Sequence, residues 1–219
     1  MHRQIAENIY LIVLAITTLL AIAKHRYKGI VFIIAYCIVM LTTEIITTKI
    51  LPTGVYNHYV YATSMLLTSG LLFSYYAYIL HHIVAYSVSA ICSIFILLVY
   101  CTNQMWLPRT IIPINYIAAY YTIHTILSAL FVWGITVQGR YKSESIHLWF
   151  SGIFMVYATI AMLNDSVVFA KVLIPIDEII SEVSYNVLNT IFFAALSIIL
   201  IQIKTVKVTW HITLIRNNE

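Results

Sequence analysis

Residues 30–48 read IVFIIAYCIVMLTTEIITT, and Glu44 is the only charged residue in this run. About 20 mostly apolar residues are needed to cross the roughly 30 Å hydrocarbon core of a bilayer, and the run has that length. It is continuously apolar, whereas the strands of a membrane barrel alternate apolar and polar residues over about ten positions. The stretch therefore predicts a membrane-spanning helix that carries one acidic group.

Further runs of the same kind fill most of the 219-residue chain, which is 62% hydrophobic and only 9% charged. Soluble domains average roughly 25% charged residues, so the composition indicates an integral membrane protein. Spans are expected near residues 8–23, 30–48, 56–80, 83–101, 111–137, 146–163 and 184–203. We therefore expect an all-α fold, a single domain over residues 1–219 that forms a seven-transmembrane-helix bundle in the cell's inner membrane.

The first span ends in Ala21-Ile22-Ala23, which superficially resembles the cleavage site of a signal peptide. Lys24, Arg26 and Lys28 follow at once, and such a cluster resists translocation across the membrane. The first span is therefore expected to remain as a helix of the bundle.

Basic residues predict the orientation of the chain, because cytoplasmic loops carry an excess of Lys and Arg. The side that holds the N-terminus has four basic residues, Arg3, Lys49, Arg109 and Lys171. The other side has eight, namely Lys24, Arg26, Lys28, Arg140, Lys142, Lys204, Lys207 and Arg216. An odd number of spans with this bias predicts an outer N-terminus and a cytoplasmic C-terminus.

Polar side chains recur at helical spacing inside several spans, and most of the strongly polar ones lie toward the outer half. A polar group in a bilayer is costly unless it faces the bundle interior or water. We predict an outward-facing polar pocket for a small ligand, lined by Glu44, Asn57, His58, Tyr61, Asn164, Asp165, Glu182, Asn186 and Asn189. The alternative interpretation is that these groups only bond neighbouring helices, which contributes roughly 0.6–2 kcal/mol per contact.

Motifs of enzymes and cofactor sites are absent from the sequence. It has no HExxH, GxSxG or Gly-rich phosphate loop, and its three cysteines form no CxxC pair. His124 lies near the middle of its span, but no second histidine is expected at a matching depth to hold a haem. We therefore expect no enzyme activity, no metal, no cofactor and no nucleic-acid partner.

Four short motifs resemble the small seven-helix membrane proteins of about 220 residues found in Bacteroidota. They are Thr43-Glu44, Tyr56-Asn57-His58-Tyr59, His147-Leu148-Trp149-Phe150-Ser151-Gly152, and Asn186 with Asn189. The resemblance covers most of the chain. It implies a role beside histidine kinases and response regulators.

The leading functional expectation is a membrane sensor or signalling module. Residues 204–219 are too short for a kinase or cyclase domain, so the signal is expected to pass to a separate cytoplasmic protein. The bilayer, this signalling protein and an unknown small ligand are the expected partners. A small-solute or proton-coupled transporter is the first alternative, and a structural subunit of a membrane complex is the second.

Overall fold

The computed structural model describes residues 2–27, 29–51, 58–80, 83–106, 114–138, 146–170 and 178–202. Within these ranges every regular element is a helix, and none is a strand. The elements are α1 His2–Ala23, α2 Ile30–Ile45, η1 Ile46–Ile50, α3 His58–Leu80, α4 Ile83–Trp106, α5 Ile114–Gln138, α6 Ile146–Ala170 and α7 Glu178–Gln202. Each span expected from the sequence therefore coincides with a helix, and η1 is a π-helical continuation of α2.

Five helices are long and apolar enough to cross a membrane, in segments Gln4–Ala23, Ile30–Ile50, Tyr116–Gly134, Ile146–Asn164 and Val183–Gln202. The chain is therefore a multi-pass membrane protein. The described apolar part of α4 is shorter, Tyr86–Thr102. α3 is less apolar because tyrosine, serine and threonine replace aliphatic residues along it, and many of these side chains are buried against other helices.

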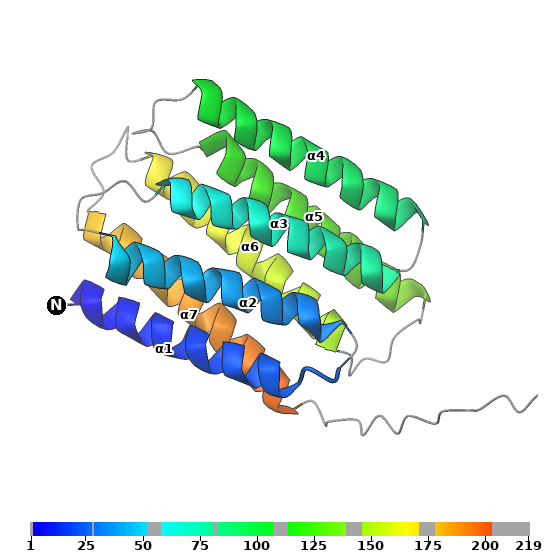
Figure 1. Ribbon diagram of the computed structural model, residues 1–219, viewed down its shortest axis with the longest axis horizontal. Coiled ribbons are helices and arrows are strands. Elements are labelled where there is room, and N and C mark those ends of the chain that lie inside the picture. Colours follow the sequence, from blue (N-terminus) through cyan, green and yellow to red (C-terminus); the bar gives the residue numbers. More distant parts are fainter. Residues whose placement is uncertain are drawn as a thin grey trace, which may run out of the picture.

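The helices lie side by side, and successive helices run in opposite directions (Figure 1). Each helix packs against its neighbour in sequence, α3 also contacts α5, and α1 closes the bundle against α7. We call the end where α1 begins and α2 finishes the Glu44 end, and the end that holds the α1–α2 turn the Gly29 end. The N-terminus lies at the Glu44 end, whereas α7 finishes at the Gly29 end (Figure 1).

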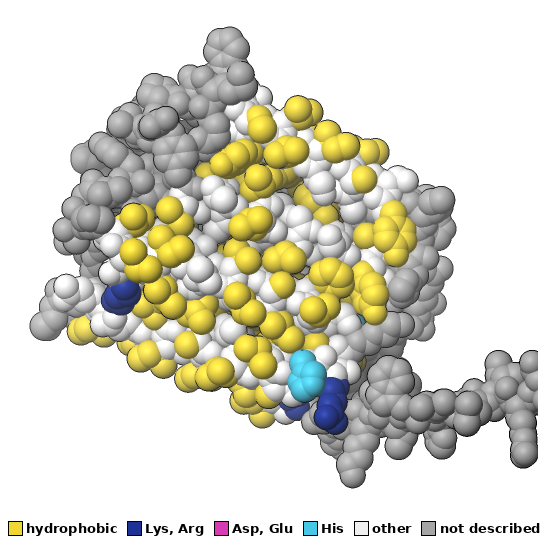
Figure 2. All heavy atoms as spheres, in the orientation of Figure 1, with side chains coloured by type: hydrophobic (Ala, Val, Ile, Leu, Met, Phe, Trp, Pro, Cys, Tyr) yellow, Lys and Arg dark blue, Asp and Glu magenta, His cyan; other side chains and the backbone are white. Residues whose placement is uncertain are grey.

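Apolar side chains cover the outside of the bundle, and many polar ones lie inside it. On α1 the exposed large hydrophobic side chains are Ile5, Ile9, Ile12, Ile16, Leu19 and Ile22, spaced three or four residues apart. Hydrophobic atoms dominate the face seen in Figure 2, and its coloured Lys and Arg side chains lie toward the two ends of the bundle. This distribution matches a helix bundle that presents its surface to hydrocarbon.

Aromatic rings from several helices fill the centre of the bundle. Tyr36 of α2 packs edge-on against Phe150 and Phe154 of α6, with centroids 6.4 and 6.0 Å apart, and it stacks on Phe193 of α7. Edge-to-face pairs of this kind contribute about 0.5–1.5 kcal/mol beyond the area that they bury. In a bilayer the hydrophobic effect does not drive helices together, so such close packing holds α2, α6 and α7 in place.

Hydrogen bonds add to the packing where α1 meets α7. Thr17 Oγ1 donates to the carbonyl of Phe193 at 3.0 Å and lies 2.7 Å from Ser197 Oγ. Ala21, one turn further along α1, is fully buried. Small and hydroxylated residues let two helices approach closely and bond across the contact.

The Gly29 end is shaped by a turn that only glycine accommodates easily. Gly29 has φ +81°, a left-handed conformation that strains other residues. A Cβ atom there would lie 3.0 Å from His147 Cε1 and 3.3 Å from Tyr78 Cε1. His147 in turn bonds the Tyr75 hydroxyl at 3.0 Å, so the turn is packed against both α3 and α6.

Replacing Gly29 by alanine is expected to destabilise the bundle by about 1 kcal/mol or more, through backbone strain and the contact with His147. The matched control is Gly152→Ala in α6, where nothing lies within 4 Å of an added Cβ. Helix propensity favours that change by up to about 1 kcal/mol. Thermal unfolding of both variants in mild detergent measures the difference. A Gly29→Ala protein as stable as the wild type would contradict this account of the turn.

Candidate functional site

Glu44 lies near the end of α2, and its side chain is only 2% exposed. The hydroxyl of Tyr10, from α1, donates to Oε1 at 3.3 Å. The hydroxyl of Tyr61, from α3, donates to Oε2 at 3.3 Å. The carboxyl group is therefore shared by the two neighbouring helices, one on each of its oxygen atoms.

The π-helical turn η1 begins directly after α2 and brings Thr47 beside this carboxyl. Thr47 Oγ1 lies 3.1 Å from the Tyr61 hydroxyl and donates to the carbonyls of Thr43 and Glu44. Thr48 Oγ1 donates to the same Glu44 carbonyl at 2.6 Å. We call Tyr10, Glu44, Thr47 and Tyr61 the Glu44 cluster.

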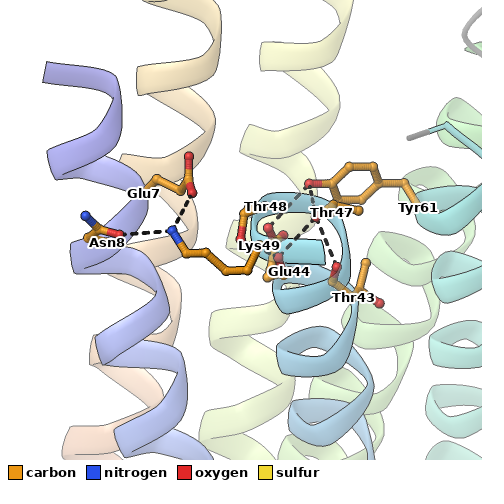
Figure 3. A network of polar contacts seen from close by, with 8 residues as sticks. All are labelled: Glu7, Asn8, Thr43, Glu44, Thr47, Thr48, Lys49 and Tyr61. Carbon is orange, nitrogen blue, oxygen red and sulfur yellow. Dashed lines mark hydrogen bonds and ion pairs between the residues drawn. The ribbon is translucent and has the colours of Figure 1, made fainter. Parts of the chain in front are cut away.

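Lys49 lies in the same turn but extends away from Glu44, toward α1 (Figure 3). Its ammonium group pairs with Glu7 Oε1 at 3.2 Å and bonds Asn8 Oδ1 at 3.3 Å. Half of the Lys49 side chain is exposed, so this surface pair contributes about 0–1 kcal/mol. Within the described part of the chain, no basic side chain forms an ion pair with Glu44.

A second polar contact lies deeper, between α6 and α7. The Tyr157 hydroxyl donates to Asn189 Oδ1 at 2.7 Å, and Asn189 is 1% exposed. Tyr185, one turn before Asn189, lies within electrostatic range of both Glu44 and Tyr157. Polar groups therefore continue from the Glu44 cluster toward Asn189.

The predicted pocket residues divide into three groups. Glu44 and Tyr61 are in contact, and Asn189 is buried against Tyr157. Asn164 accepts a hydrogen bond from Ser184 at 2.9 Å and so joins α6 to α7, while Asn186 is half-buried. Asn57 lies outside the described residues, and so do the side chains of His58, Asp165 and Glu182, although these three belong to helices α3, α6 and α7.

Three residues of the site were not among the predicted pocket residues, namely Tyr10, Thr47 and Tyr157. Thr47 follows Glu44 by three residues in the second expected span, and this helical spacing was the available signal. Tyr10 is the only tyrosine of the first expected span, on the same helix face as Thr17 and Ala21, and this register was the available signal. Tyr157 lies among aliphatic residues of α6 and has no comparable signal. Its importance depends on Asn189, which belongs to another helix.

The single mid-span histidine is part of the packing between helices. His124 of α5 is fully buried, and its Nε2 lies 3.2 Å from Ser69 Oγ of α3. Its ring stacks on Phe73 with centroids 4.8 Å apart. His124 therefore joins α5 to α3 through its ring and its bond to Ser69.

Comparisons of the chain with models of protein families, with curated proteins and with solved structures found no match. The interpretation of the site therefore depends on its own geometry.

Tyr157→Phe is expected to lower the free energy of unfolding by about 0.5–1.5 kcal/mol, because the buried Asn189 Oδ1 loses the hydroxyl group that donates to it. Thr159→Val on the same helix is the control, since the Thr159 hydroxyl bonds only the carbonyl of Met155 in α6. Thermal unfolding of the two purified variants tests this. Equal losses of stability in the two variants would show that the Tyr157–Asn189 bond stabilises the protein no more than a hydrogen bond within α6 does.

Proposed function

We propose that this chain is a membrane sensor that binds a small ligand at the Glu44 cluster and signals to a separate cytoplasmic protein. One observation carries the proposal, the Glu44 carboxyl that bonds Tyr10 of α1 and Tyr61 of α3. An ionisable group within a span is a functional candidate by default. A ligand that contacts this carboxyl also changes how three helices are joined.

The proposal includes seven membrane spans, with the N-terminus outside and the C-terminus in the cytoplasm. Helices at each expected span and the opposite ends of α1 and α7 support this arrangement (Figure 1). The eight basic residues of the C-terminal side, against four on the other, support the direction. The Glu44 cluster then lies toward the outer side, where an external ligand arrives.

Helix α2 offers a route for the signal across the membrane. It carries Glu44 near one end and begins directly after Gly29, whose turn packs against His147 and Tyr78. A shift of α2 at the Glu44 end therefore changes contacts with α3 and α6 at the other. Arg26 is exposed beside that turn, and this basic end is the proposed contact surface for the cytoplasmic partner.

The sensor proposal has a direct test in the partner protein. The tagged chain is purified from its native membrane in mild detergent, and proteins that co-purify in stoichiometric amount are identified by mass spectrometry. Partner activity is then measured with wild type and Glu44→Gln. We expect the Glu44→Gln variant to reach normal membrane levels and to bind its partner. We expect it no longer to change the activity of the partner in response to the ligand.

Glu7→Gln is the matched control, because Glu7 is an acidic residue at the same end that contacts Lys49 instead. It is expected to respond normally. An unchanged response in Glu44→Gln would remove Glu44 from the ligand site.

A transporter is the second candidate, and the depth of the polar groups favours it. Bonded polar pairs occur along the interior, from Glu44 with Tyr61, through His124 with Ser69, to His147 with Tyr75 at the Gly29 end. Transport predicts flux of a solute or of protons in proteoliposomes that contain only this chain. Tight vesicles without flux for a broad panel of substrates would reject it.

A further inference from the structure

The buried carboxyl of Glu44 has no positive partner in the part of the chain that the structure describes. Its side chain is 2% exposed, and the nearby Lys49 is engaged with Glu7 and Asn8. Buried carboxylates in proteins are paired with a cation, coordinate one or take up a proton, because an isolated buried charge is very costly. The site is therefore complementary to a positive charge.

Among the described residues, the side chains that bond the Glu44 carboxyl do so through hydroxyl oxygen atoms. Oε1 and Oε2 each lie 3.3 Å from a tyrosine hydroxyl, and the Tyr61 hydroxyl lies 3.1 Å from Thr47 Oγ1. Hydrogen bonds between oxygen atoms usually measure about 2.7–2.8 Å. Oxygen ligands at about 2.4 Å from one ion lie about 3.4 Å apart in octahedral geometry. The spacing thus suits atoms that share a cation.

Oxygen donors select a hard cation, since thiolate and imidazole are the ligands that favour transition metals. Among the described residues, no three His, Cys, Asp or Glu side chains gather as such metals require. Glu7 is the acidic neighbour on α1, and it is paired with Lys49. Glu44 then supplies one negative charge that no described basic side chain pairs with, which points to a monovalent ion.

The helix end contributes further negative character. The C-terminus of a helix carries a partial negative charge, and α2 ends in the π-helical turn η1. In the last turn of α2 the carbonyls of Thr43 and Glu44 accept hydrogen bonds from the hydroxyl groups of Thr47 and Thr48, which belong to η1. Irregular helix ends with carbonyl oxygens are where membrane transporters hold Na⁺.

We propose that the Glu44 cluster is a binding site for a small monovalent metal cation such as Na⁺. The ion is held by the Glu44 carboxylate, the hydroxyls of Tyr10 and Tyr61, and Thr47 Oγ1, so that it links α1, α2 and α3. The cation is then the ligand of the proposed sensor. Binding of the ion to the cluster does not depend on the proposed function, and only its expected effect on the cytoplasmic partner rests on it.

The test uses the purified full chain in detergent at constant ionic strength, with NaCl, KCl or choline chloride as the salt. Thermal stability is expected to rise with Na⁺ and to saturate, because an ion that binds only the folded state stabilises it. Choline, a much larger cation than Na⁺, is expected to give no such rise. Binding of ²²Na⁺ by scintillation proximity gives a second, direct measurement.

Three variants locate the ion. Glu44→Gln is expected to lose both ²²Na⁺ binding and the Na⁺-dependent rise in stability. Tyr61→Phe keeps the aromatic ring and is expected to weaken Na⁺ affinity roughly tenfold. Glu7→Gln alters only the exposed pair with Lys49 and is expected to bind Na⁺ as the wild type does. If Glu44→Gln fails to fold, Tyr61→Phe carries the test.

The proposal is overturned if wild type binds no ²²Na⁺ and has equal stability in sodium and choline. It is also overturned if Glu44→Gln or Tyr61→Phe binds Na⁺ with wild-type affinity, or if only acidification stabilises the wild type, which would make a proton the occupant. A Glu44-dependent partner response without Na⁺ binding rejects the cation and keeps the sensor. Na⁺ binding with an unaltered partner response in Glu44→Gln rejects the sensor and keeps the site.

Discussion

The hydrocarbon core of a bilayer offers no hydrogen-bond partners, and the arrangement of this chain follows from that constraint. Backbone groups are satisfied within helices, and polar side chains turn toward other helices. Thr17 bonds the backbone of α7, Glu44 accepts from α1 and α3, and Asn189 accepts from α6. The interior of the bundle is consequently more polar than its aliphatic outer surface.

The same constraint gives a buried acidic group unusual influence over the fold. When a surface ion pair such as Lys49 with Glu7 breaks, water replaces the lost contacts at little cost in free energy. Glu44 has no such alternative, so any change in its charge or its contacts acts directly on Tyr10 and Tyr61. Because these residues belong to α1 and α3, a local event at the end of α2 becomes a change in helix packing.

Hydropathy predicts where helices cross a membrane better than where they end. α6 continues through Asn164 to Ala170, and α7 begins at Glu178, although the expected spans ended near residue 163 and resumed near residue 184. Helices continue beyond the hydrocarbon core because their backbone bonds form equally well in the headgroup region. The polar residues at these ends therefore belong to helices, where Asn164 bonds Ser184 across α6 and α7.

The sequence by itself determined the helices, their apolar outer faces and the presence of one acidic residue within the second span, because each depends on local composition and on the 3.6-residue period. Only the tertiary structure decided which helices are neighbours and therefore which residues meet. Periodicity places Glu44 on a face of α2, but the pairing with Tyr10 and Tyr61 depends on how α1 and α3 pack there. The contact of Tyr157 with Asn189 arises in the same way, since packing between α6 and α7 joins residues that no local pattern connects.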